Sequence, residues 1–457
     1  MAKTVLERDL SGQTRQILID NEKLTVQASA SETGAHRSRK EASVAFLKRV
    51  FLPSGYPITV SPDYVRYQWL NALQAFCNSL ASLLSSRAIL QGFGVGDPHA
   101  TATHAMLLTI LQDIFSRLTT ICAAHLLGTS LYPEAKKYRL LADILNDFAV
   151  VLDTFSPFFA SLAVPGLRVG ALCLSAGLKS LCGICAGGSK AAITLHFANP
   201  VGHKGDVGDL NAKDSSKETV LALLGSLLGT VVVPHLTSPA ATYAALFVLI
   251  ALHLLINYLG VKGLALRTLN KQRLTIAWLF YCTKSDVPLA DISAKFERIF
   301  LNASSIIDPQ SGVTLGECVL GSSVSRSMTK PIPPELFDLF EREKYLIWYE
   351  NHAAGCSHPR VHIYLKDKYT SNDLLKAWVH AVEVCRTVGQ RVRREHLPPK
   401  ADYVKDAYLY LDTHFSFFLS KLRAADWDTV ESALMTGGPT AIITDVTFAP
   451  SEDRKRR

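Results

Sequence analysis

The chain has 457 residues, of which 48% are hydrophobic and 19% are charged, and its formal net charge is +8. The charged fraction lies below the quarter that is typical of globular domains, which argues against a wholly water-exposed protein. Four basic clusters lack the interleaved aromatic residues of a nucleic-acid motif, so we expect no nucleic-acid partner. We expect these clusters to be attracted to anionic lipid headgroups instead. The clusters are residues 37–40, 136–139, 391–394 and 454–457.

Residues 1–45 are polar and show little periodicity, which predicts a flexible arm with one short strand around residues 16–24. The arm carries no apolar leader, so we expect no cleaved secretory signal. Residues 51–57 combine two prolines with a glycine and predict a turn. Ser61, Pro62 and Asp63 then provide a cap, a first-turn proline and a first-turn acid, which together predict the start of a helix.

The first predicted helix covers residues 63–90 and carries a polar stripe on an otherwise apolar surface. Asn71, Gln74 and Asn78 recur at helical spacing, and Ser82 and Ser85 extend the series. Polar groups in hydrocarbon need partners, so the stripe is expected to face other helices or a wet cavity. The alternative is an amphipathic helix on the surface of a soluble protein.

A glycine-rich turn containing Asp97 precedes a second helix over residues 103–127. The glycines do not follow a strand, so a dinucleotide loop is not predicted. Asp113 and Arg117 are four residues apart with the acid first, the better order for an intrahelical pair. In a membrane we expect this pair to turn inward.

A third helix is predicted over residues 135–155. Arg139, Asp143, Asn146 and Asp147 lie on roughly one side of it. Carboxylates on one face of an apolar helix are costly unless they are paired, hydrated or bound to a cation. This face is therefore a candidate interior polar network.

Residues 160–197 are rich in Gly, Ala, Ser and Cys, and we expect one span or two half-spans there, interrupted by Lys190. Small residues four apart allow close contact between helices in lipid. Two such pairs are predicted to pack helices together, namely Gly183 with Gly187 and Gly225 with Gly229. Cys182 and Cys185 have redox spacing, but we interpret them as small buried residues because no strand precedes them.

No Asp, Glu, Lys or Arg occurs between residues 219 and 261. A span needs about 20 apolar residues, so this run predicts two membrane helices, 219–233 and 240–259, joined by a proline-bounded turn. A polar loop over residues 200–217 precedes them. The alternative is a buried hairpin in a large soluble core. Basic residues at 262–273 place the following domain on the cytosol-like side.

Beyond residue 284 the composition becomes that of a soluble α+β domain. Strands are predicted at 344–350, 360–366 and 441–448, and two helices follow Thr370. The predicted fold class is mainly α, a multi-helix membrane-embedded domain followed by a small soluble α+β domain. The predicted boundaries are a flexible arm at 1–45, a helical domain at 46–280 and a soluble domain with a basic tail at 281–457.

An ordered series of short stretches in this chain resembles the root UVB-sensitive family over about residues 50–275. Ser54, Lys190 and a longer loop at 200–210 depart from the family pattern, and the C-terminal domain matches only loosely. The stretches are Phe51–Pro57, Ser61–Tyr64, Tyr67–Trp69, Gln74–Cys77, Gly94–Asp97, Ala100–Thr103, Ala142–Asp147, Ala191–Ala198, Ala212–Asp214, Glu218–Thr219 and Leu266–Asn270.

The resemblance implies a membrane-associated protein whose molecular activity is unsettled; the apolar helices predict a multi-pass protein, and the sequence does not specify its organelle. Plant members of the family are linked to early seedling development, auxin transport and vitamin B6 homeostasis. No catalytic residue is established for the family, so none is carried over. A protein partner is expected, with another family member as the first candidate.

Three hypotheses follow. The preferred one is a non-enzymatic membrane scaffold or regulator that acts through its soluble domain. The second is a carrier for a small molecule or ion. The third is an enzyme or sensor that uses pyridoxal phosphate, with Lys190 as the Schiff-base lysine; no other cofactor and no metal site is predicted. The residues proposed for an interior polar network are Asp143, Asn146, Asp147, Asp113, Arg117, Asp97, Asn71, Gln74, Asn78 and Lys190.

Overall fold

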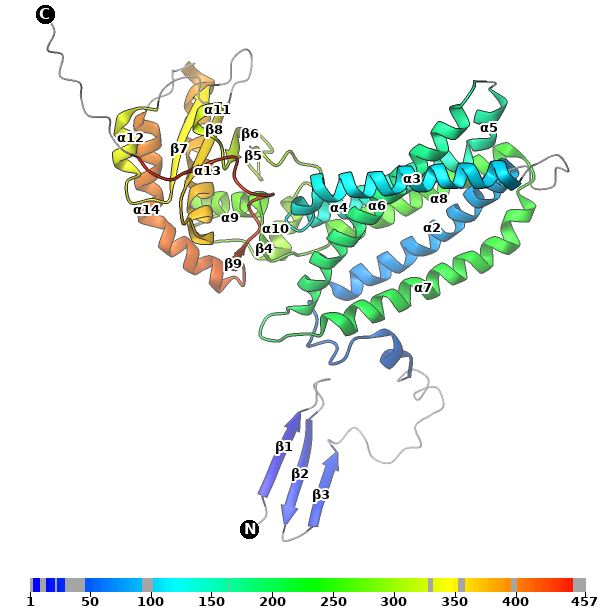
Figure 1. The fold of residues 1–457 in the computed structure, drawn as a ribbon. Helices are drawn as coiled ribbons and strands as arrows, with labels where there is room; N and C mark the ends of the chain where they lie inside the picture. The colour runs from blue at the N-terminus through cyan, green and yellow to red at the C-terminus, as the bar shows by residue number, and fades with distance from the viewer. Residues whose placement is uncertain are drawn as a thin grey trace, which may run out of the picture. The chain divides into compact units, whose positions relative to one another are not determined.

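The computed structural model describes residues 3–8, 14–20, 23–28, 46–92, 102–162, 164–327, 332–351, 358–395 and 401–446. The chain forms two compact units, Met1–Leu264 and Ala265–Arg457 (Figure 1). The first unit is helical apart from an N-terminal sheet, and the second mixes helices with strands. The prediction of a mainly α chain with small sheets in its C-terminal region is confirmed.

The N-terminal segment contains three strands rather than the single strand predicted. β1 (Lys3–Arg8), β2 (Thr14–Asp20) and β3 (Lys23–Ala28) form an antiparallel sheet in that order. Ile17 pairs with Val5 on one side and with Val26 on the other. The prediction was wrong because the polar composition of the segment concealed short aliphatic runs such as Ile17, Leu18 and Ile19, whose residue types favour strands.

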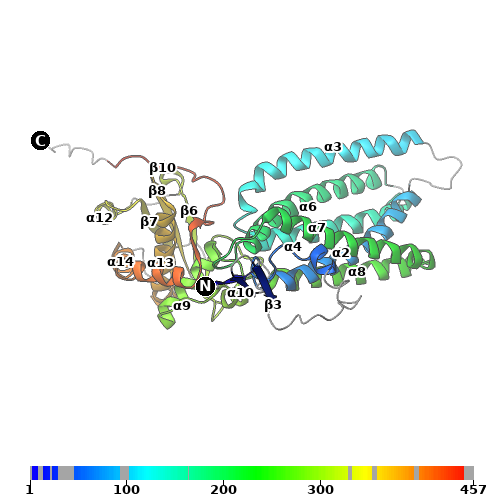
Figure 2. The ribbon, with the colours of Figure 1, turned by 90° about the horizontal axis from the view of Figure 1, so that it is seen from below.

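Six long helices make up most of the first unit, and Figures 1 and 2 show them side by side. α6 is one continuous helix, not two half-spans. The bounds are α2 Tyr64–Gly92, α3 Ala102–Leu127, α4 Ala135–Thr154, α6 Leu167–Ala198, α7 Val207–Val232 and α8 Pro239–Lys262, with the short α5 Ser156–Ser161 and the 3₁₀ turns η1 Gly128–Ser130 and η2 Val233–His235.

Helix α7 begins well before the predicted apolar arm, which corrects the polar loop expected over residues 200–217. Asp206 caps the helix, and its carboxylate accepts hydrogen bonds from the backbone N–H groups of Gly208 (2.7 Å) and Asp209 (3.1 Å). A side chain that satisfies these otherwise free donors stabilises a helix start. The charged first half of α7 is therefore helical and brings Asp214 and Glu218 into the bundle.

Helix α2 lies at the centre of the first unit. It packs against α4, α7 and α8, while α4 packs closely against α6. Helix α3 contacts α6 and lies at the edge of the bundle (Figure 2). The central position of α2 gives its polar stripe neighbours on several sides.

The outer faces of the helices expose many large apolar side chains. Four described helical segments, Ala105–Ser130, Leu167–Ala198, Val207–His235 and Pro239–Lys262, are long and apolar enough to cross a bilayer. Contiguous apolar patches of this kind are rare on soluble monomers. Those on α3, α7 and α8 include Leu107, Ile110, Ile114, Leu118, Ile121, Leu223, Leu227, Val231, Phe247, Val248 and Leu255.

The two predicted glycine pairs behave differently. A Cβ at Gly225 would lie 2.7 Å from the Phe76 carbonyl oxygen, and one at Gly229 would lie 2.2 Å from Leu83 Cδ1, so α7 approaches α2 closely at both points. A Cβ at Gly183 or Gly187 would meet nothing within 4 Å. The prediction of close packing is therefore wrong for Gly183 and Gly187 within this single chain.

The second unit is built on a mixed sheet. β8 (Pro359–Lys366) is its central strand; it pairs antiparallel with β7 (Tyr345–Asn351) and parallel with both β6 (Thr314–Leu320) and β10 (Ile442–Ile443). β5 (Ser305–Ile307) pairs with β6, and β4 (Thr268–Leu269) pairs separately with β9 (Asp428–Ser432).

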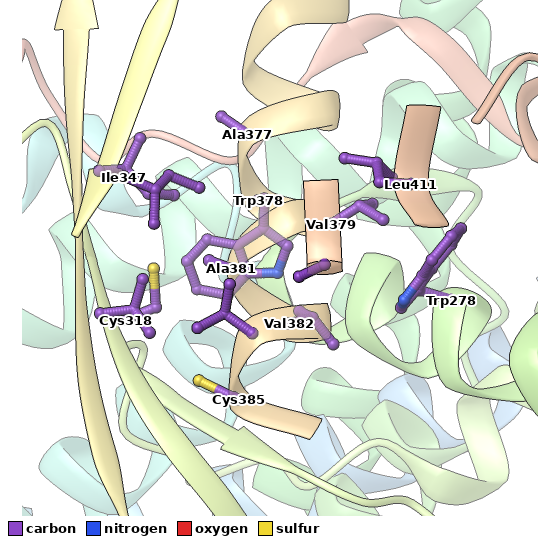
Figure 3. Close-up of a cluster of buried hydrophobic side chains, with 14 of the residues drawn as sticks. Trp278, Cys318, Ile347, Ala377, Trp378, Val379, Ala381, Val382, Cys385 and Leu411 are labelled. Atoms are coloured by element: carbon purple, nitrogen blue, oxygen red, sulfur yellow. The ribbon is translucent and has the colours of Figure 1, made fainter. Parts of the chain in front are cut away.

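Helices cover this sheet and enclose an apolar core (Figure 3). α13 (Ser371–Glu395) packs on β6 and β8 and also contacts α9 (Lys271–Lys284) and α14 (Ala401–Ala424). Trp278 of α9 and Trp378 of α13 are fully buried there. The sequence had assigned most of α9 to the helical domain, whereas its side chains pack in the second unit. The remaining short helices are α10 Ala290–Phe296, α11 Val324–Ser327 and α12 Pro334–Leu339.

Candidate functional site

The polar stripe of α2 is buried and runs along the inside of the helical unit. Gln68, Asn71 and Gln74 are each at most 7% exposed. Their spacing of three residues puts them on neighbouring positions of one helix face. Because buried amides need hydrogen-bond partners, the helices around α2 must supply them.

Helix α7 supplies carboxylates at the first end of the stripe. Asp214 accepts hydrogen bonds from the Tyr64 hydroxyl (2.7 Å) and from Gln68 Nε2 (2.5 Å), and it pairs with Lys217 Nζ (2.9 Å). One turn further along, Glu218 accepts a hydrogen bond from Asn71 Nδ2 at 2.6 Å. Asp214 belongs to the segment that was predicted to be a loop, and Glu218 follows directly after that segment.

Helix α6 adds a cation to the same place, and α4 adds a second. Lys190 Nζ lies 3.1 Å from Glu218 Oε1. Arg139 Nη2 donates to Asn71 Oδ1 at 2.9 Å and lies 3.8 Å from Asp143. Asn71 therefore connects the Lys190–Glu218 pair to the Arg139–Asp143 pair.

Further along the stripe, α4 and α8 complete the network. Asp143 accepts hydrogen bonds from Gln74 of α2 and Asn257 of α8. Asn146 Nδ2 donates to Asn78 Oδ1 at 2.9 Å. The last contacts pair Asp147 with His253 Nδ1 at 2.8 Å and Asp153 with Lys179 Nζ at 2.5 Å.

A cavity of about 200 Å³ opens at the Asp214 and Glu218 end of this network, and we call it the charged pocket. Its wall comes from α2, α4, α6 and α7, and it combines two cations, two carboxylates and two aromatic rings. The lining residues are Tyr67, Gln68, Asn71, Arg139, Ala186, Gly187, Lys190, Ile193, Thr194, Phe197, Asp214 and Glu218.

Most of the residues predicted for the network come together in this way. They are Asn71, Gln74, Asn78, Asp143, Asn146, Asp147 and Lys190.

Two of the predicted residues, Asp113 and Arg117, do not join the network. Arg117 and Asp113 form their intrahelical pair at 2.7 Å, but their side chains are 75% and 56% exposed. The expectation that this pair turns inward is wrong for the single chain, because α3 lies at the edge of the bundle and contacts α6 with another face. Asp97 lies outside the described residues.

The sequence interpretation missed Asp214, Lys217, Glu218, His253 and Asn257. The signal for the first three was their place immediately before a long uncharged run. His253 and Asn257 are four residues apart in a helix that otherwise has few polar side chains, so their shared face was detectable. Among the described residues, no cluster of three His, Cys, Asp or Glu side chains has the arrangement of a metal site.

Two family models match the chain. One, described as a vitamin B6 photo-protection and homoeostasis domain, matches residues 37–285. The other, described as the C-terminal region of root UVB sensitive protein, matches residues 312–437. The charged pocket and the network behind it lie within the first match.

Curated relatives agree with these models. RUS family member 1 of Dictyostelium discoideum is 33% identical over 273 residues, which are 59% of this chain and 50% of that protein. Protein root UVB sensitive 3 of Arabidopsis thaliana is 27% identical over 83% of this chain and 82% of its own length. Protein root UVB sensitive 2, chloroplastic, from the same plant is 25% identical over 84% of this chain and 82% of its own length. No solved structure matches.

Proposed function

Since the chain belongs to the root UVB-sensitive family, we propose that it is a multi-pass membrane protein that carries a small polar molecule through its charged pocket, with a vitamin B6 compound as the first candidate. The observation that carries the proposal is the pairing of a polar cavity with an apolar exterior. Intramembrane ionisable residues that face a bundle interior are typical of substrate and ion pathways.

The size and lining of the charged pocket support a small ligand with more than one kind of polar group. Pockets for drug-sized ligands measure about 300–1,000 Å³, so a cavity of about 200 Å³ suits a smaller molecule. Arg139 and Lys190 are suited to an anionic oxygen or a phosphate, and Glu218 is suited to a protonated nitrogen. Tyr67 and Phe197 offer rings for stacking. A substituted pyridine that carries hydroxyl, amine or phosphate groups meets all these requirements.

The proposal assigns transport to the helical unit and no chemical step to the chain. Lys190 Nζ is engaged by Glu218 in the ion pair described above, which weakens the hypothesis that this lysine forms a Schiff base with pyridoxal phosphate. In this proposal the second unit lies on the cytosol-like side, which the basic residues that follow α8 support.

Uptake by vesicles tests the function. Full-length protein is reconstituted into phospholipid vesicles, and the entry of radiolabelled pyridoxine, pyridoxal and pyridoxal phosphate is measured. We expect uptake above that of empty vesicles for at least one compound, and a loss of ten-fold or more for Lys190→Met. Lys405→Met, on an exposed face of α14, is the matched control and should transport normally. Equal uptake by wild type and Lys190→Met would rule out this pocket.

The scaffold hypothesis, which the sequence favoured, becomes the second candidate, and the exposed apolar side chains of the second unit support it. Leu409 and Phe417 of α14 are each 54% exposed, and Val430 of β9 is 81% exposed. A partner surface there would take another member of the same family. Capture of a tagged family member by full-length protein should fall in a Leu409→Ser, Phe417→Ser variant, and undiminished capture would exclude this surface.

A further inference from the structure

A histidine–carboxylate pair lies in the helical unit beyond the wall of the charged pocket. Asp147 is near the middle of α4 and His253 is near the middle of α8, with 2.8 Å between Oδ2 and Nδ1. Their side chains are 5% and 2% exposed, respectively. Neither residue lines the charged pocket.

The partner of Asp147 differs in kind from the partners of the neighbouring acids. Lysine or arginine pairs with Asp143, Asp153, Asp214 and Glu218, and these basic side chains carry a charge at neutral pH. Histidine is the side chain whose charge ordinarily changes between pH 5 and 8. His196 pairs with Asp63 at 3.0 Å, but that pair lies at the last turn of α6. The Lys and Arg pairs are Arg139–Asp143, Lys179–Asp153, Lys217–Asp214 and Lys190–Glu218.

We propose that the Asp147–His253 pair is a proton-binding site and that its proton is coupled to the solute in the charged pocket. The pair changes from a net charge of −1 to zero when one proton binds, whichever of the two side chains holds it. The coupling rests on the proposed function, whereas the proton site does not.

The surroundings of the pair make its charge costly when the proton is absent. Asp143 lies one turn away on α4 and interacts electrostatically with Asp147. The titratable neighbours from the other helices are the thiols of Cys77 on α2 and Cys182 on α6. Arg139 forms its ion pair with Asp143, whereas the ion-pair partner of Asp147 is His253. A bound proton relieves this excess of negative charge, which is unfavourable in an apolar environment.

A short series of contacts joins the proton site to the pocket. Asp147 acts on Asp143, which pairs with Arg139 in the pocket wall. Arg139 donates to Asn71, which in turn donates to Glu218 beside Lys190. Binding of a proton thus changes the charge balance that an anionic group meets at Arg139. By reciprocity, a bound solute changes the affinity of the pair for a proton by the same factor.

Counting protons tests the site without any solute. Purified full-length protein in detergent is titrated between pH 8 and pH 5, and the protons taken up per chain are measured. We expect His253→Asn and Asp147→Asn each to take up about one proton fewer than wild type. His203→Asn removes an exposed loop histidine and serves as the control for a histidine outside the pair. If the pair is only a structural contact, it keeps its charge throughout, and both variants will match wild type.

Folding of the variants is checked by gel filtration and by the helical circular dichroism signal. Should His253→Asn fail to fold, Asp147→Asn decides the matter alone. Should both fail, infrared spectra of wild type with ¹⁵N-labelled histidine count the titrating rings between pH 8 and pH 5. A buried ring that titrates supports the site, and its absence overturns it.

Binding measurements separate this inference from the proposed function. In wild type we expect the affinity for pyridoxal phosphate to change on the order of ten-fold between pH 8 and pH 5, within the 5–150-fold range that is usual for coupled sites. In His253→Asn, the affinity for pyridoxal phosphate should change less than two-fold between pH 8 and pH 5. Ligand binding with an unchanged proton count overturns the proton site. If the variants take up one proton fewer but wild type binds no ligand, the proposed carrier function is wrong and the proton site stands.

Discussion

The two units of this chain distribute polar and apolar side chains in opposite ways. In the helical unit Asp143, Asp147 and Asp214 are buried, while large aliphatic residues cover the outside. In the second unit Trp278 and Trp378 are buried in the apolar core, and most charged side chains lie on the surface. The side chains on the outside of a folded protein match the solvent around it, so this contrast is the one expected if, as proposed, the helical unit lies in a membrane and the second unit in water.

The contrast also shows where each unit gains its specificity. The core of the second unit is held by close packing of apolar surface, which is non-directional but sensitive to volume. The helical unit gains little from burying apolar surface if its surroundings are equally apolar. Its helices are instead positioned by directional hydrogen bonds along α2 and by close approach at glycines. Substitutions on the surface and in the interior of each unit test this contrast.

The largest effect should come from a cavity in the second unit. Phe418 of α14 is completely buried, whereas its neighbour Phe417 is 54% exposed. Phe418→Ala should lose about 3–5 kcal/mol of unfolding free energy, because it removes a buried ring and leaves a void. Phe417→Ala should lose less than about 1 kcal/mol, as surface changes usually do.

Tryptophan fluorescence during urea unfolding of the full-length protein measures both variants. Four of the five tryptophans, Trp278, Trp348, Trp378 and Trp427, are buried in the second unit, so the signal reports mainly on that unit. Similar losses in the two variants would mean that Phe417 is covered by a partner, which would favour the scaffold hypothesis.

The next effect tests whether the two exposed surfaces meet different solvents. Leu228 of α7 is 46% exposed and Phe417 of α14 is 54% exposed. Leu228→Lys should disfavour membrane insertion by about 2.5–3.5 kcal/mol if α7 crosses the bilayer near this point. Phe417→Lys should have almost no effect on insertion.

Membrane extraction with alkaline carbonate, followed by flotation on a density gradient, measures insertion for both variants. We expect a smaller membrane fraction for Leu228→Lys alone. Equal flotation of the two variants would remove the distinction between the surfaces and restore the soluble helical hairpin as the better interpretation.

A third effect concerns a polar group that the second unit does bury. His380 of α13 is fully buried; its Nε2 contacts the Val404 carbonyl at 3.2 Å and its Nδ1 contacts the Tyr345 hydroxyl at 3.3 Å. Burial lowers the pKa of His380 to about 3. In the unfolded chain the pKa is about 6.5. As the pH falls below about 6.5, the unfolded state takes up this proton first, and stability declines until the folded state is protonated near pH 3.

The difference between the two pKa values lowers the free energy of unfolding by about 2 kcal/mol at pH 5 relative to pH values above about 6.5, where the contribution of neutral His380 is complete. His380→Gln keeps a polar side chain that does not titrate, so its stability should fall less between pH 7 and pH 5. Urea unfolding followed by tryptophan fluorescence measures the slope for both proteins. Parallel slopes would show that His380 opens to water and that this part of the core is looser than described.

Spacing along the chain predicted the elements of the site better than their partners. The stripe of Asn71, Gln74 and Asn78 follows from helical periodicity alone, because three- and four-residue steps define one face. The start of α7 was missed because a single cap, Asp206, outweighs a polar composition. The N-terminal sheet was missed because short aliphatic runs are a weak strand signal in a polar segment.

The partners of the stripe depend on which helices meet, and spacing within one helix does not contain that information. Glu218 and His253 became part of the site only when α7 and α8 packed against α2 and α4. Asp113 and Arg117 had an equally suggestive spacing, yet α3 turns them outward. A polar residue in an apolar helix therefore predicts a partner without saying which one.

The smallest effect tests the glycines that bring α7 against α2. A Cβ at Gly225 would press on the Phe76 backbone oxygen at 2.7 Å, and backbone does not yield as a flexible side chain does. Overpacking costs about 1–3 kcal/mol, and replacing a helical glycine by alanine returns up to about 1 kcal/mol. Gly225→Ala should therefore lower the stability of the folded protein by about 1 kcal/mol. The measurement is the midpoint of thermal aggregation in detergent, which should fall. At Gly183 the added methyl group meets no other atom, so Gly183→Ala should raise the midpoint of thermal aggregation slightly. If Gly183→Ala lowers the midpoint instead, a second chain packs on the face of α6 that carries Gly183. The predicted contact between small residues then occurs between two proteins and not within one chain.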